Sequence, residues 1–191
     1  MANDALAKTL KALKLDVEKA YIGVDQAVVA GNASTGRKMA SASNMISTGL
    51  DAGSNATDAL TEAKLLALHQ TCYENGSDPS VLMVKPADAS IVASFATASS
   101  RQRDIAASKT LTNAIEVLIT PFGTVRVLIN RSNLATVAFL IDPSMWKQAV
   151  LRPFTRTLLA KNGDADTHFV VGEVSLKHSN FGSCGKITGL S

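Results

Sequence analysis

Histidine and cysteine side chains at helical spacing are the first groups in this chain that offer ligands for a metal ion. His69 and Cys72 lie three residues apart in a segment with helical periodicity, so they share one helix face. With His178 or Cys184 they would supply the nitrogen and sulfur ligands of a zinc site. The spacing does not require a metal, because both cysteines stand outside paired-ligand motifs. We therefore expect the cysteine of this face to pack in the core, and we predict no metal and no cofactor.

A phosphate-binding loop is the second candidate, at residues 31–38. Gly31 and Gly36 have the glycine spacing of such a loop. Arg37 stands where a lysine should reach the phosphates, and Lys38 stands where a serine or threonine should hold magnesium. The segment also follows a long helical pattern and not a strand. We therefore predict a flexible connection at this place.

Groups suited to nucleophilic catalysis are scattered along the chain. The Gly-x-Ser-x-Gly turn of many hydrolases does not occur in the sequence. Glu173 lies inside a predicted strand, and Asp142 precedes a proline, where a helix cap explains it. His168 and His178 flank one predicted strand and are expected at the surface. The sequence thus predicts no catalytic residue, and we do not expect an enzyme.

Aromatic and basic side chains gather at residues 145–154. Trp146 is the only tryptophan of the chain, and we expect it to anchor the core and not to stack on a ligand. Arg152 can pair with a carboxylate of its own subunit or with one of a neighbour. The sequence leaves that choice open.

Length and composition limit the class of protein. The 191 residues are 46% hydrophobic and 18% charged, with a formal net charge of +3. Such a chain can bury a core as one domain or two small ones, and it is not disordered as a whole. Like charges form no block, so contact with DNA would be diffuse. A signal peptide and a membrane-spanning apolar run are both absent from the sequence, so we expect a protein made and kept in the cytoplasm.

Hydrophobic periodicity predicts the elements that position these residues. Apolar residues at intervals of three and four predict one long amphipathic helix over residues 4–29. A loosely helical or irregular connection over 31–56, of a composition that favours mobility, should follow. A second helix is expected from about 57 to Asn75-Gly76, which is a typical C-terminal signal. A short buried strand is expected at 81–84, and a helix begun by proline is expected at 86–95.

Strands mixed with short helices are predicted for the second half of the chain. In order, we expect an exposed polar loop, a β-hairpin, a strand, a short helix capped by Asp142, and two more strands. Their residues are 96–109, 115–130, 137–141, 142–150, 168–178 and 183–187. Helices in the first half and mixed elements in the second predict an α+β fold.

Short motifs along the chain carry a resemblance to a known family. They include Asn75-Gly-Ser-Asp-Pro-Ser-Val-Leu-Met-Val84, Ile119-Thr-Pro-Phe-Gly-Thr-Val125, Phe139-Leu-Ile-Asp142, Leu151-Arg-Pro-Phe154, Gly172-Glu-Val-Ser-Leu176 and Gly185-Lys-Ile-Thr-Gly-Leu190. By their order and spacing the chain resembles the major capsid proteins of tailed bacteriophages, which are built on the Hong Kong 97 type fold. The first predicted helix resembles the long spine helix of that fold.

The resemblance implies a structural protein that assembles itself. Copies would form pentamers and hexamers of an icosahedral phage head that encloses double-stranded DNA, with non-specific contact to the DNA. The resemblance also implies portal, scaffold and decoration proteins as further partners. The implied location is the virion, which is assembled in the host cytoplasm. The N-terminal arm and extended loop that usually precede the spine helix are expected to be missing.

The resemblance also implies domains and subunit contacts. Residues 1–79 would hold the spine helix and the first part of a peripheral domain, residues 80–165 an axial domain, and residues 166–191 the returning peripheral strands. We expect the polar loop at 99–104 to point toward the capsomer axis. Candidate interface residues are Arg101, Arg103, Asp104, Arg131 and Arg152.

One alternative from another class stays open. A small cytoplasmic α+β enzyme, or a metal- or ligand-binding domain, would use a pocket near His69, Cys72 and Trp146.

Overall fold

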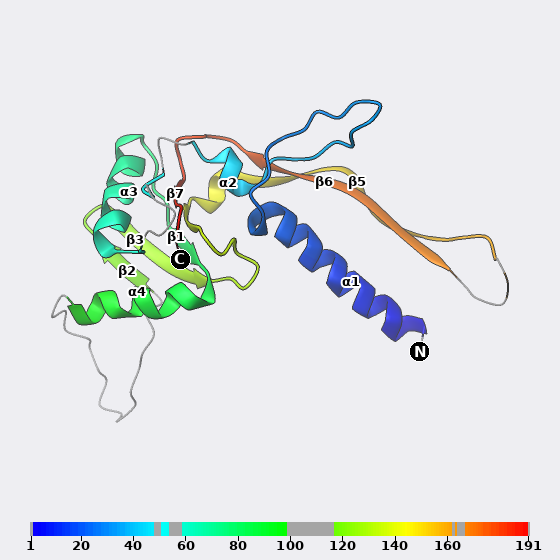
Figure 1. Ribbon diagram of the computed structural model, residues 1–191, viewed down its shortest axis with the longest axis horizontal. Coiled ribbons are helices and arrows are strands. Elements are labelled where there is room, and N and C mark those ends of the chain that lie inside the picture. Colours follow the sequence, from blue (N-terminus) through cyan, green and yellow to red (C-terminus); the bar gives the residue numbers. More distant parts are fainter. Residues whose placement is uncertain are drawn as a thin grey trace, which may run out of the picture.

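The molecule consists of a sheet domain with its helices and an extended part made of one helix and a two-stranded ribbon (Figure 1). The computed structural model describes residues 2–47, 51–53, 59–98, 117–161, 163 and 167–190. The helical elements are α1 (Ala2–Glu18), the π-helical turn η1 (Lys19–Gly23), α2 (Ala42–Met45), α3 (Glu62–Glu74), α4 (Pro86–Ala98) and the 3-10 turn η3 (Pro143–Met145). The strands are β1 (Val81–Val84), β2 (Val117–Thr120), β3 (Gly123–Ile129), β4 (Ala138–Ile141), β5 (Trp146–Leu158), β6 (His168–His178) and β7 (Gly185–Ile187).

Strand β1 lies at the centre of the sheet domain. The five strands follow the order β2-β3-β1-β4-β7. β1 pairs in parallel with β3 and antiparallel with β4, whereas β2 with β3 and β4 with β7 are antiparallel pairs. A parallel pair needs a crossover connection, and the chain that contains α4 and β2 provides it between β1 and β3.

One hydrophobic cluster holds the helices on this sheet. Leu82 and Val84 are buried and alternate along β1 with half-buried residues, as the two-residue period of a strand requires. Phe95 of α4 and Leu68 of α3 belong to the same cluster. α3 lies so close to β7 that a Cβ atom at Gly185 would stand 2.6 Å from Leu68 Cδ1. The sheet domain therefore has an ordinary close-packed core.

β5 and β6 form a separate antiparallel sheet of two strands, called the ribbon from here on. Its pairing begins with Trp146 opposite His178, and the register shifts twice between Val150 and Thr155. Pro153 lies in this irregular stretch, where its missing N–H removes no regular ladder bond. Figure 1 shows the ribbon leaving the sheet domain and extending on the same side as α1.

The C-terminal end of α1 is attached to the loop between β3 and β4. Asn130 Nδ2 donates to Glu18 Oε1 at 2.7 Å, and the backbone N–H of Leu134 donates to the carbonyl of Ile22 at 3.1 Å. At Gly23 a Cβ atom would lie 2.6 Å from a backbone oxygen of this loop, so only glycine fits. The described side chains of α1 and η1 are at most half-buried. These contacts attach the C-terminal end of the helix to the sheet domain.

Most predicted elements of the sheet domain are confirmed, and so is the α+β class. The second helix ends at Glu74, directly before the predicted Asn75-Gly76 signal, but it begins at Glu62 and not at about 57, because Thr61 is extended and caps it. β1 and the β2–β3 hairpin lie at the expected places, and β4, β6 and β7 are present. α4 is three residues longer than predicted, and the rest of the predicted polar loop after it lies outside the described residues.

The prediction that the first helix continues to residue 29 is wrong. Helical structure ends at Gly23, because the close approach of the β3–β4 loop turns the chain there. Residues 24–40 form a loop that is closed by a β-bridge between Val29 and Lys38. Val24 and Val28 continue the apolar spacing of the helix without being part of it, and both are exposed.

The short helix predicted after Asp142 is also wrong. Asp142 does cap a turn, since its Oδ1 accepts the N–H of Ser144 at 3.0 Å, but this turn ends at Met145. The chain then continues as the 13-residue strand β5. β5 is rich in β-branched and aromatic residues, which favour strands, and the capping signal before it concealed that preference.

Two isoleucines of the same sheet test where the core lies. Ile187 in β7 is 0% exposed and Ile119 in β2 is 76% exposed. Ile187→Ala should lower the free energy of unfolding by about 2–5 kcal/mol, because it opens a cavity. Ile119→Ala, the matched control, should change it by less than about 0.5 kcal/mol. Urea unfolding of both variants, followed by circular dichroism, measures the difference, and equal losses would contradict this core.

Candidate functional site

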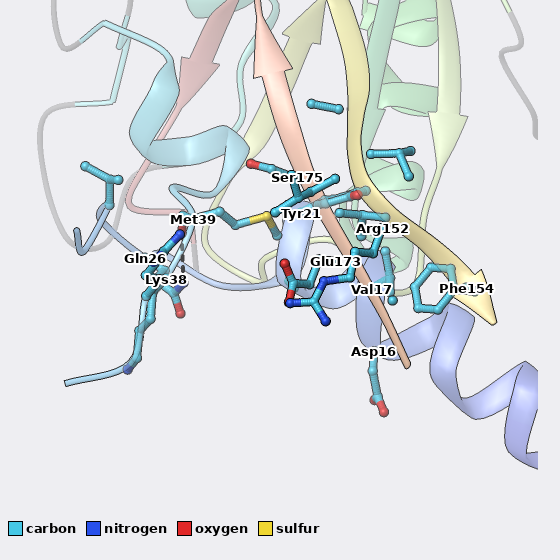
Figure 2. Close-up of a pocket in the computed structure, with 18 of the residues that line it drawn as sticks. Asp16, Val17, Tyr21, Gln26, Lys38, Met39, Arg152, Phe154, Glu173 and Ser175 are labelled. Carbon is cyan, nitrogen blue, oxygen red and sulfur yellow. Dashed lines mark hydrogen bonds and ion pairs between the residues drawn. The ribbon is translucent and has the colours of Figure 1, made fainter. Parts of the chain in front are cut away.

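A groove with a volume of about 1350 Å³ lies between α1, the loop 24–40 and the ribbon. Figure 2 shows its lining from three sides, with Val17 from α1 and Tyr21 from η1, Met39 from the loop, and Arg152 and Phe154 from β5. Most of the lining surface is apolar. The extended part of the molecule therefore carries an apolar groove that the residues around it leave open.

The apolar stripe of α1 forms one wall of this groove. Leu13 and Val17 lie on the stripe and are half-buried, as is Tyr21 in η1, whereas Leu10 is 39% exposed. An amphipathic helix is normally stabilised by packing this stripe on another layer. Here the layer is incomplete. Neither α1 nor any other helix in the described part of the chain is long and apolar enough to cross a membrane.

The ribbon carries a set of exposed apolar side chains, called the ribbon surface from here on. Every residue of β5 after Trp146 is exposed. A two-stranded sheet has no second layer and is at best marginally stable alone in water, so this exposure follows from the topology. Apolar groups gathered on a monomer mark interaction sites. The ribbon surface consists of Val150, Leu151, Phe154, Leu158 and Phe169, with exposed fractions between 44% and 73%.

Arg152 pairs with a carboxylate of its own chain. Its Nη2 lies 2.9 Å from Glu173 Oε1, across the ribbon at the register shift. The two side chains are 65% and 44% exposed, so the pair contributes about 0–1 kcal/mol to stability. The pair therefore joins the two strands where their ladder is irregular and adds little to stability.

The glycine-rich loop is an exposed hairpin-like turn and not a phosphate site. The backbones of Val29 and Lys38 exchange two hydrogen bonds of 2.9 and 3.0 Å. Between them, Asn32 Oδ1 accepts the N–H groups of Ser34 and Thr35. A phosphate-binding loop joins a strand to the N-terminus of a helix, whereas this loop lies between η1 and α2.

The residues considered as zinc ligands are packed in the core of the sheet domain. Cys72 and Cys184 are fully buried and belong to its hydrophobic cluster, so the packing role predicted for Cys72 is confirmed. Burial and the neighbouring Cys184 raise the pKa of Cys72 to about 12, which leaves the thiol protonated and a poor ligand. Within the described ranges, no three side chains of the types His, Cys, Asp or Glu come together to hold a metal.

The surface position predicted for His178 is wrong. His178 is 9% exposed, and its ring stacks on Trp146 with the ring centroids 4.1 Å apart. Trp146 packs against the core cluster, as predicted. His168, at the other end of β6, is half-buried, and its Nε2 lies 2.7 Å from a guanidinium nitrogen of Arg156. Sequence spacing did not reveal the stack because it depends on the pairing of β5 with β6.

The five candidate interface residues fall in three places. Arg101, Arg103 and Asp104 lie outside the described residues. Arg131 is exposed in the turn after β3, and Arg152 lies in the groove. The structure thus brings only Arg152 to the candidate surface.

The main element that sequence reasoning missed is the ribbon surface. A short helix was expected where β5 begins, and no element was expected between residues 151 and 167. The signal that could have found the strand is the run of β-branched and aromatic residues from Val150 to Thr157.

Comparisons with known proteins give two matches. Residues 2–191 match the family described as SU10 major capsid protein. A relative named "Major capsid protein", from Escherichia phage Phieco32, is 30% identical over 122 residues. The match covers 62% of this chain and 35% of the relative, so the chain spans about a third of the length of the relative that it matches.

The second buried histidine, His69, makes the stability of the sheet domain depend on pH. The Thr120 hydroxyl donates to the carbonyl of Gly123, so it accepts from His69 Nδ1, and His69 Nε2 finds no partner among the described residues. Burial lowers the pKa of His69 from its ordinary 6.5, and attraction by Asp78 offsets part of this effect. The folded state therefore favours the neutral ring.

Acidification should for this reason destabilise the protein. The stabilisation is fully present above the ordinary pKa of 6.5 and is lost as the pH falls below it. In His69→Asn the amide still donates to Thr120 but does not titrate, so this variant should lose less stability between about pH 7.5 and pH 5.5 than the wild type. Part of the loss remains, because burial also lowers the pKa of His178. Urea unfolding at both pH values measures it, and identical losses in the two proteins would contradict the role of His69.

Proposed function

The chain belongs to the SU10 major capsid protein family, and from this premise we propose that copies of it assemble through the groove and the ribbon surface into the phage head. As a family member it is a structural protein of the virion and not an enzyme. The proposed assembly consists of pentamers and hexamers that close into an icosahedral shell around double-stranded DNA. Repeated heterologous contacts around a closed ring produce such capsomers.

The observation that carries this proposal is the ribbon surface. Five apolar side chains stand on a two-stranded sheet, beside a helix whose apolar stripe is only half covered. A subunit that worked alone would bury such groups in its own core, whereas a shell subunit can bury them against other copies. The extended shape in Figure 1 offers neighbours a long contact area. These features support assembly over a function in isolation.

The Hong Kong 97 type fold is the finer form of the proposal. In this assignment α1 is the spine helix, residues 1–79 and 166–191 belong to the peripheral domain, and residues 80–165 form the axial domain. A long helix beside a two-stranded ribbon supports the assignment of α1. β5 and β6 lie on opposite sides of the boundary at residue 165 and pair along their length, so the ribbon would connect the two domains.

Further partners follow from the same proposal. Portal, scaffold and decoration proteins would meet the assembled shell, and packaged DNA would touch its inner side. The formal net charge of +3 suits a weak contact that does not depend on DNA sequence. In the same proposal, the shell is assembled in the host cytoplasm.

A small enzyme or ligand-binding domain receives no supporting observation. Its pocket was expected near His69, Cys72 and Trp146, but the first two are 0% exposed and the third packs against the core. His69 and Cys72 are therefore closed to a ligand, and Trp146 is half-buried against the core.

The ribbon surface can be tested by removing apolar groups without adding charge. Leu151 and Leu158 are 73% and 57% exposed, so Leu151→Ser with Leu158→Ser should leave the melting temperature nearly unchanged. The same double variant should reduce particles in electron micrographs by roughly tenfold or more, because contacts repeated in a shell multiply each loss. The matched control is Thr155→Ser with Thr157→Ser on the same strand, which should assemble normally. Equal yields from both double variants would refute the proposed surface.

The polar loop can be tested by charge reversal. Arg101→Glu with Arg103→Glu should impair capsomer formation if the loop lies at the capsomer axis. The formal charge of residues 101–104 changes from +1 (two Arg, one Asp) to −3 (two Glu, one Asp) in every copy around the axis, so the copies repel one another more strongly. Arg101→Lys with Arg103→Lys keeps the charge and should assemble better than the reversed pair. Sedimentation and electron microscopy measure the products, and shells of normal size and yield from the reversed variant would exclude the axial position.

A further inference from the structure

Trp146 and His178 stand at the point where the ribbon joins the sheet domain. They are the first residue of β5 and the last residue of β6, and they face each other in the pairing register. One step further, the N–H of Ser179 donates to the carbonyl of Met145 at 3.0 Å. Beyond this bond the two segments of the chain separate: one forms η3 and the other leads to β7. The Trp146–His178 pair is therefore the root of the ribbon.

Hydrogen bonds at the root fix the protonation state of His178. Ser183 Oγ donates to the carbonyl of Asn180 at 2.7 Å, so it accepts from His178 Nε2, which lies 3.2 Å away. Nε2 therefore carries the proton of the neutral ring, and Nδ1 carries a lone pair. Nδ1 is buried and has no hydrogen-bond partner within the described part of the chain. A second proton on this ring would have no acceptor.

Three aromatic rings and one thiol are in contact at the root of the ribbon. The rings of His178 and Trp146 are 17° from parallel, and the ring of Phe181 meets His178 edge-on at 5.8 Å. Trp146 Nε1 donates to Cys184 Sγ at 3.1 Å, which ties the stack to the beginning of β7. The neutral imidazole thus packs as one more flat apolar group between ribbon and sheet domain.

The charges near the root do not overcome this burial. Asp142, before η3, attracts a proton to His178, and a stacked tryptophan face also favours a cation. Burial nevertheless lowers the pKa of His178 overall. Lys177, the neighbour on β6, is exposed, and the Cys72 thiol in the core is neutral, since burial raises its pKa to about 12. Cys184 meets the stack as the hydrogen-bond acceptor of Trp146.

We propose that the Trp146–His178 stack is a proton-controlled joint, in which the neutral ring fixes the ribbon to the sheet domain and protonation of Nδ1 releases it. The mechanism needs no other chemical step, because one proton moves from solvent to Nδ1. A charged ring without an acceptor at Nδ1 is forced toward water, and the stack must open to let it out. The released ribbon would present its surface in variable directions. The consequence for shell assembly rests on the proposed function.

The single tryptophan makes the joint observable in the purified protein. Trp146 fluorescence, recorded from about pH 8 to about pH 5, should show one transition, because a protonated imidazole quenches the indole stacked on it. The midpoint of this transition should lie below 6.5, because burial lowers the pKa of His178. Over the same range, hydrogen exchange corrected for its intrinsic pH dependence should rise about tenfold or more in β5 and β6. Exchange in β1 and β4 should change much less.

Three variants separate the joint from other titrations. His178→Phe keeps a flat ring, His178→Gln keeps a donor for Ser183, and neither titrates, so both should lose the fluorescence transition and the rise in exchange. His168→Gln is the matched control at the far end of the same strand and should behave as the wild type. Any one of three results would overturn the proposal. The fluorescence transition could persist in both His178 variants, it could be absent in the wild type, or the quenching could occur without faster hydrogen exchange in the ribbon. The proposed shell assembly is tested separately, by electron micrographs of the wild-type protein at about pH 8. A failure to assemble would therefore be distinguishable from a failure of the joint, which is measured by fluorescence and hydrogen exchange.

Discussion

A sheet of only two strands has no second layer of its own, so the apolar side chains of the ribbon stay in water unless another surface covers them. Val150, Leu151 and Phe154 are 53%, 73% and 44% exposed for this reason. α1 does not solve the problem, because the described side chains of its own apolar stripe are at most half-buried. The remaining apolar area favours contact with further copies of the chain.

The sheet domain supplies the rigid base from which this extended part projects. Its mixed five-stranded sheet is packed closely against α3, with a contact at Gly185 that admits no side chain. Two narrow attachments lead outward from it. Asn130 and Leu134 hold the end of α1, and the stack of Trp146 on His178 holds the root of the ribbon. Such an arrangement suits a member of a major capsid protein family, since the shape of a shell depends on the angles between its subunits' contact surfaces.

Local signals in the sequence predicted the sheet domain better than the extended part. Asn75-Gly76 ends α3, the turn at Pro121 to Gly123 joins β2 and β3, and Asp142 caps η3, because each signal acts within a few residues. The strand β5 was missed because the capping signal at Asp142 concealed the preference of the following residues for a strand. The burial of His178 was missed as a consequence, since Trp146 reaches it only through the pairing of β5 with β6. The groove could not be predicted at all, because it requires α1, the loop 24–40 and the ribbon to be placed together.

Hydrogen exchange of the protein before and after assembly tests most directly whether the extended part is the assembly surface. Peptides from β5, β6 and α1 should exchange about tenfold or more slowly in assembled particles, because neighbouring copies cover them, whereas peptides from β1 and β4, already buried in the sheet domain, should change little. Unchanged exchange in β5 and β6 on assembly, with protection confined to the sheet domain, would contradict the account.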